Sequence, residues 1–135
     1  MKSLPTLLKI AQSQIDAIAV EIARAQSALD GLATHRAMIL ARAEAEVSSA
    51  GSLDFVMQAA LPQYLFRNKA ELAQIDRELE QGEAMLEGIR ERLMVAYREK
   101  AKLESLERHH AERHRLDEQA REQAALDESA LTRRG

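Results

Sequence analysis

Two stretches of the chain carry apolar residues at a seven-residue repeat, in steps of three and four. In the first stretch these positions are Leu4, Leu8, Ala11, Ile15, Ile18, Ile22, Ala25, Leu29, Leu32 and Ile39. In the second they are Leu61, Leu65, Leu72, Ile75, Leu79, Leu86, Ile89, Leu93, Ala96 and Leu103. The repeat is interrupted at Arg36, Asn68, Gly82 and Lys100. A repeat of 3.5 residues keeps one narrow stripe of a helix facing a partner helix, so the pattern predicts a coiled coil.

A Gly/Ser-rich break over residues 48–52 separates the two stretches. We therefore expect a single all-α domain over residues 1–135, a long antiparallel two-helix coiled-coil hairpin with an overhanging C-terminal helix. The first helix is predicted over about 4–48, the turn over about 49–54 and the second helix over about 55–130. Ser3 can cap the first helix, Gly51 can adopt a positive φ, and Ser52 or Asp54 can cap the second helix.

Pro62 lies early in the second stretch, where a proline removes one helical hydrogen bond and kinks the chain. Either a short helix from Leu53 to about Ala60 precedes a kink, or the second helix begins near Pro62. We favour one kinked helix, because Leu61 and Leu65 already fall on the later repeat.

The two predicted helices differ in length. The first, at about 1.5 Å per residue, is roughly 65 Å long and ends opposite about Arg98 of the second. Beyond Leu106, the large apolar residues are only Leu116, Leu126 and Leu131. We call residues 107–134 the C-terminal extension. Such a segment is either frayed or completed by another protein.

Composition supports long helices and argues against several other classes. Charged residues are 30% of the chain, the net charge is −3, and no basic stripe suggests nucleic-acid binding. The chain has no cysteine, no alternating strand pattern and no apolar run near the roughly 18 residues that span a bilayer. The residues before Leu4 do not resemble a signal peptide. We expect a soluble cytoplasmic protein that contacts other proteins and has no catalytic residue and no cofactor.

Three histidines, His109, His110 and His114, cluster in the C-terminal extension. His110 and His114 share a helical face, a spacing that can hold zinc, but the chain lacks the His-Glu-x-x-His motif. A structural or solvated role is therefore favoured over a metal site. Gly82 and Gly88 lie within the second helix, where each costs about 1 kcal/mol relative to alanine, so close packing or local flexibility explains them.

Four residues gather around the hairpin tip: Phe55, Met57, Tyr64 and Phe66. We call them the tip cluster. They can close the end of the hairpin, or they can form a docking patch, since exposed apolar clusters commonly mark interfaces. The sequence leaves both interpretations open.

The C-terminal part of the chain, from residue 102 onward, carries a recognisable motif. It reads Lys-Leu-Glu-Ser-Leu-Glu-Arg over residues 102–108 and Arg-Glu-Gln-Ala-Ala-Leu-Asp-Glu over residues 121–128, followed by Arg133 and Arg134. This resembles the C-terminal signature of the flagellar export protein FliJ family. The three histidines stand where that family typically has Lys, Arg or Glu. The motif covers about residues 100–130, and the hairpin architecture is similar over the whole chain.

The resemblance implies a cytoplasmic component of the flagellar type III export apparatus, peripherally associated with the inner membrane at the flagellar base. Proteins of this family resemble the central stalk subunit of rotary ATPases. They bind the export ATPase ring, promote its assembly and activity, and contact the export gate membrane protein and the export chaperones. They have no catalytic residues, do not bind nucleic acid and do not insert directly into the membrane. The ATPase would face Arg108, Arg113, Arg115, Arg121 and Glu122. The gate would face Phe55, Tyr64 and Phe66.

Other classes of function remain open at this point. One is a general coiled-coil scaffold, or the equivalent stalk or chaperone protein of a virulence type III secretion system. Another is a hairpin that enters the channel of a nucleic-acid enzyme. Such a hairpin would be expected to carry acidic residues at its tip or a basic stripe, and the tip of this chain has only Asp54. An enzyme is the least favoured class.

Overall fold

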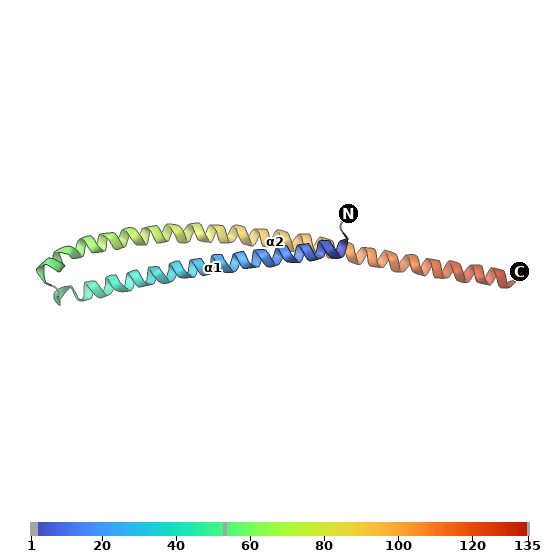
Figure 1. Cartoon of the computed structure of the whole chain (residues 1–135), viewed down its shortest axis with the longest axis horizontal. Coiled ribbons are helices and arrows are strands. Elements are labelled where there is room, and N and C mark those ends of the chain that lie inside the picture. Colours follow the sequence, from blue (N-terminus) through green and yellow to red (C-terminus); the bar gives the residue numbers. More distant parts are fainter. Residues whose placement is uncertain (1–2, 53, 135) are drawn as a thin grey trace. The chain divides into compact units, whose positions relative to one another are not determined.

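The computed structural model describes residues 3–52 and 54–134. It contains two long helices, α1 (Leu4–Ser48) and α2 (Phe55–Arg134), with a short 3₁₀ helix, η1 (Ala50–Ser52), between them. The prediction of an all-α antiparallel helical hairpin is confirmed (Figure 1). Leu53, where the alternative short helix was predicted to begin, lies outside the described residues. Met1 and Lys2, which were considered as part of a signal peptide, also lie outside them.

Side-chain caps define where both helices begin. The Oγ of Ser3 accepts a hydrogen bond from the backbone N–H of Thr6 (3.4 Å) at the start of α1. At the start of α2, Asp54 Oδ1 accepts one from the N–H of Met57 (2.8 Å), so Asp54 rather than Ser52 is the cap. Each cap satisfies a backbone donor that has no partner within its helix. α2 is continuous through Pro62, and its green N-terminal end curves toward the reversal in Figure 1.

The chain reversal differs from the prediction at Gly51. No residue in the described part of the chain, Gly51 included, has a positive φ. The turn is built instead from η1, with the N–H of Ser52 donating to the carbonyl of Ser49 (3.0 Å). Gln58 Nε2 donates to the carbonyl of Ala50 (2.8 Å) and so ties the first turn of α2 to η1. A tight right-handed turn therefore replaces the left-handed glycine.

The chain divides into two compact units, and the first comprises Ala17–Leu93. Within it, α1 and α2 run antiparallel, and Leu29, Ile39, Ile75 and Leu86 are buried. Every apolar position of the predicted repeat in this unit is buried or half-buried. We call these positions, together with those at which the repeat is interrupted, the core positions. The apolar residues among them remove apolar surface from water, which is the main source of stability for helices of this length.

Polar residues interrupt the repeat in this unit without leaving its core face. Arg36 and Asn68 are both half-buried, although neither side chain is apolar. The guanidinium of Arg36 reaches across to Asp76, with Nε 2.7 Å from Oδ1. Two further pairs join the helices, His35 with Glu71 (3.1 Å) and Glu21 with Arg92 (2.6 Å). The Nδ2 of Asn68 is enclosed and has no hydrogen-bond partner in the described part of the chain. Polar groups at core positions favour one register over its alternatives.

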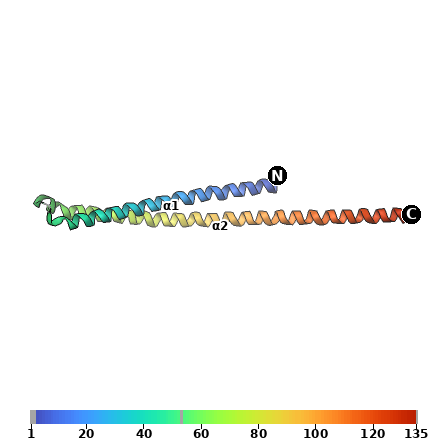
Figure 2. The ribbon, with the colours of Figure 1, turned by 90° about the horizontal axis from the view of Figure 1, so that it is seen from below.

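The second unit comprises Met1–Asp16 and Met94–Gly135. Its buried residues are Ala11 and Ile15 of α1, and Lys100 of α2 donates to the Oε1 of Gln12 (2.7 Å). Beyond Glu104 every described residue of α2 is exposed. In Figures 1 and 2 the red C-terminal part of α2 has no other helix beside it. The C-terminal extension is therefore helical but makes no tertiary packing contact within its unit.

Gly82 and Gly88 differ in what surrounds them, and this difference predicts opposite mutational effects. A Cβ at position 82 would lie 2.6 Å from Cδ2 of Leu29, whereas a Cβ at position 88 would meet nothing within 4 Å. We expect Gly88→Ala to stabilise the protein by about 0.5–1 kcal/mol through helix propensity. Gly82→Ala gains the same propensity but overpacks the core, at a cost of about 1–3 kcal/mol. Chemical denaturation of both variants measures this, and an equal stabilisation by both would contradict the close packing of Leu29 on Gly82.

Candidate interaction surfaces

The tip cluster is the most exposed group of large apolar side chains in the unit Ala17–Leu93. Phe55 is 84% exposed, Phe66 72% and Met57 57%, and Val56 beside them is also exposed. Tyr64 is half-buried and lines a small cleft of about 190 Å³ with Met57, Leu61, Ala60 and Glu46. Because the two phenylalanine rings face solvent, they do not close the end of the hairpin. Their exposure favours the docking interpretation.

The C-terminal extension presents its charged residues on several faces of one helix. Arg108, Arg115 and Glu122 are seven residues apart, so they lie along one face, whereas Arg113 and Arg121 lie on others. The structure thus brings together three of the five residues that the sequence grouped. Leu106, Leu116, Leu126 and Leu131 are 48–71% exposed. An isolated helix of this kind presents both apolar and charged side chains to a partner.

Arg115 and Glu112 form an ion pair within the extension. Arg115 donates to Glu112 through Nε (3.1 Å) and Nη2 (2.5 Å), one helical turn away. The hydrogen bond from Arg115 lowers the pKa of the Glu112 carboxyl, and the same contact raises the pKa of Arg115. Both groups stay charged over the physiological range. Arg115 is thereby held by its own helix, while no ion pair holds Arg108, Arg113 or Arg121 in the described part of the chain.

The three histidines of the extension do not converge. His114 lies 3.7 Å from Glu118 on the same helix, and all three rings are on exposed residues. Among the residues that the structure describes, no group of three or more His, Asp or Glu side chains is placed to hold a metal ion. The three histidines are therefore exposed residues on the surface of α2.

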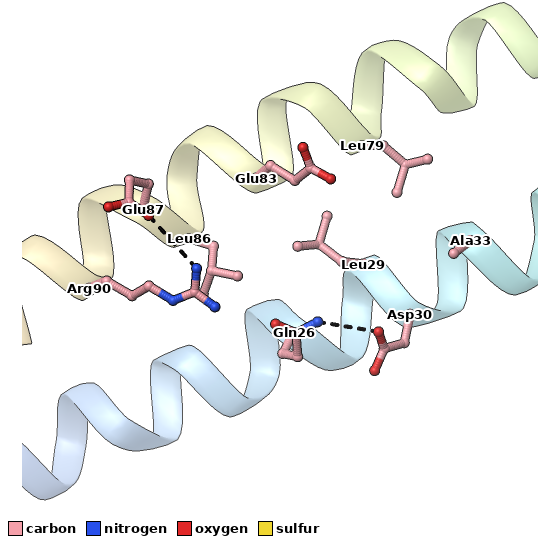
Figure 3. Close-up of a pocket in the computed structure, with 9 residues that line it drawn as sticks. All are labelled: Gln26, Leu29, Asp30, Ala33, Leu79, Glu83, Leu86, Glu87 and Arg90. Carbon is pink, nitrogen blue, oxygen red and sulfur yellow. Dashed lines mark hydrogen bonds and ion pairs between the residues drawn. The ribbon is translucent and has the colours of Figure 1, made fainter.

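A groove between α1 and α2 was not anticipated from the sequence. It has a volume of about 450 Å³ and lies in the unit Ala17–Leu93. The lining residues are Gln26, Leu29, Asp30, Ala33, Leu79, Glu83, Leu86, Glu87 and Arg90. Figure 3 shows Leu29, Leu79 and Leu86 pointing into the space between the two helices. No sequence signal could have revealed it, because its lining depends on which residues of α1 and α2 face each other.

No helix in the described residues combines the length and the apolar character needed to cross a membrane. A comparison with protein-family models matches residues 1–134 to the model described as "Flagellar FliJ protein". No curated protein and no solved structure gives a significant match.

Proposed function

This chain belongs to the FliJ family and is therefore a component of the flagellar export apparatus, and from this premise we propose that it is the stalk-like partner of the export ATPase. In this proposal it binds the ATPase ring, promotes ring assembly and ATP hydrolysis, and connects the ring to the export gate and the export chaperones. It acts without catalytic residues or a cofactor of its own, at the cytoplasmic side of the flagellar base.

The observation that carries the proposal is the unpaired C-terminal extension. Every described residue from Ser105 onward is exposed, yet the segment is helical to Arg134. A long helix is stabilised mainly by burying one face, so a helix without such a face is suited to a partner that supplies one. A pore lined by several identical subunits would offer contacts to all sides of the helix. That fits the placement of Arg108, Arg113 and Arg121 on different faces.

The tip cluster supports a second contact in the same proposal. Phe55, Met57 and Phe66 present large apolar side chains to solvent, in the unit that does not contain the extension. Exposed aromatic residues are typical anchors of protein interfaces. We assign the tip cluster to the export gate or its chaperones, and the extension to the ATPase.

A truncation tests the ATPase contact. The variant ending at Glu107 removes only exposed residues of the extension, so we expect it to remain folded by circular dichroism. In a pull-down with the cognate export ATPase, the full-length chain should be retained and the truncated chain should be lost. The matched control is the full-length chain with Phe55→Ser and Phe66→Ser, which should be retained. Equal retention of the truncated and full-length chains would exclude the extension as the ATPase contact.

A further inference from the structure

The small cleft at the hairpin tip has a mostly apolar lining that solvent reaches, and one carboxylate. Its volume is about 190 Å³, and it lies within the unit Ala17–Leu93. We call it the tip cleft, and its lining residues are Glu46 of α1 and Met57, Ala60, Leu61 and Tyr64 of α2. Met57 and Ala60 are exposed, and Leu61 and Tyr64 are half-buried rather than buried. A side chain from outside can therefore contact this lining directly.

The carboxylate of the tip cleft has no partner of its own. Glu46 is exposed, and its carboxylate forms no hydrogen bond or ion pair with any residue that the structure describes. Over residues 43–66 the sequence has Glu44 and Glu46 before the reversal and Asp54 within it, and no lysine, arginine or histidine. Asp54 is already engaged as the cap of α2, through the N–H of Met57. The charge that remains at the cleft is therefore negative and unpaired.

This combination matches a lysine or arginine side chain better than the other side-chain classes. Both residues lay an aliphatic stem on apolar surface while the charged end stays at the edge of that surface, in water or beside a carboxylate. An acidic side chain would be repelled by Glu46. A purely apolar side chain would remove water from Glu46 without offering it a partner. A cleft of this size accommodates one long side chain rather than a helix.

We propose that the tip cleft is an anchor site for a lysine or arginine side chain of a partner protein, whose docking segment is both apolar and basic. The stem would lie against Met57 and Leu61, with the charged end beside Glu46. The exposed rings of Phe55 and Phe66 would contact apolar residues of the same segment. The inference rests on the proposed docking role of the tip cluster, and it adds the chemistry of the partner. Two tips of the same chain would not pair in this way, because their carboxylates would repel each other.

The test uses the full-length chain with labelled methionine methyl groups and a synthetic peptide of about 12 residues that has one central lysine between leucines. We expect a saturable shift of the Met57 methyl signal. The signals of Met85 and Met94, which are exposed but lie outside the tip cleft, should not shift. A second peptide carries norleucine in place of the lysine, which keeps the stem and removes the charge. It should bind about five-fold more weakly, as expected for one partly exposed ion pair.

Two substitutions assign this difference to Glu46. Glu46→Gln should weaken the lysine peptide about five-fold and leave the norleucine peptide within about two-fold, because the two changes remove the same ion pair. The matched control is Glu44→Gln, an exposed carboxylate two residues away and outside the cleft, which should leave both affinities within about two-fold.

Several results would overturn the proposal: absence of peptide binding, shifts of Met85 or Met94 equal to that of Met57, equal affinities of the two peptides, or equal effects of Glu46→Gln and Glu44→Gln. Sedimentation of the chain alone is measured in parallel, and a dimer that dissociates in Glu46→Gln would assign the cleft to a second copy and also overturn it. Titration with the soluble domain of the export gate protein separates this inference from the proposed function. Absence of gate binding would refute the proposed gate contact, whereas the peptide titrations decide the chemistry of the tip cleft.

Discussion

Replacing Leu86 with alanine is expected to lower the free energy of unfolding by about 2–3 kcal/mol, the low end of the range for buried leucines, because a two-helix core is only partly enclosed. Leu86 is 4% exposed and packs in the core of the unit Ala17–Leu93, beside Leu29. Truncation removes apolar contacts that no neighbouring side chain can replace. Urea denaturation followed by circular dichroism measures the change.

The adjacent residue supplies the control for this prediction. Met85 is 69% exposed, so Met85→Ala removes a side chain of similar size from solvent and should change stability by no more than about 0.5 kcal/mol. If the two substitutions destabilised the protein equally, the face of α2 assigned to the core would be incorrect.

Replacing both Phe55 and Phe66 with serine is expected to weaken binding of the soluble domain of the export gate protein by about 30-fold or more. That factor corresponds to a loss of about 2 kcal/mol, the threshold for an interface hot spot. Both rings are exposed in the unbound chain, so their removal should leave its unfolding midpoint unchanged. Isothermal titration calorimetry with the gate domain measures the affinity.

Tyr97 is the matched aromatic control for the tip cluster. It is 53% exposed and lies in the other unit, so Tyr97→Ser should not alter binding of the gate domain. Unchanged affinity in the Phe55→Ser, Phe66→Ser variant, or an equal loss in Tyr97→Ser, would show that the tip cluster is not the docking patch.

The seven-residue repeat predicts the core of both units because helix geometry alone determines which positions face a partner helix. Positions as small as Ala11 and Ala25 are buried or half-buried where the repeat places them. Helix geometry also places the polar residues that interrupt the repeat, because Arg36 and Asn68 are half-buried at core positions despite their polarity. The repeat could not reveal that Asp76 pairs with Arg36, because cross-helix pairs depend on the register between the helices.

Local turn chemistry was a weaker guide than the repeat. Gly51 permits a positive φ but does not require one, and η1 reverses the chain with right-handed backbone throughout. Residue types in a short loop therefore leave several turn geometries open, and the hydrogen bonds of Ser52 and Gln58 decide among them.

The candidate surfaces were predictable to different degrees. Exposure of Phe55 and Phe66 follows from their positions off the repeat, but only the structure separates them from the half-buried Tyr64. The groove between α1 and α2 could not be predicted, because its lining depends on which residues face each other across the two helices. A single sequence contains no information on that register beyond the length of the turn.

ATP hydrolysis by the cognate export ATPase, measured with and without this chain, tests the central claim most directly. Full-length chain should raise the rate and the assembly of the ATPase, and the chain ending at Glu107 at the same concentration should not. No change on addition of the full-length chain, or an equal increase with the truncated chain, would contradict the account of the C-terminal extension as the segment that engages the ATPase.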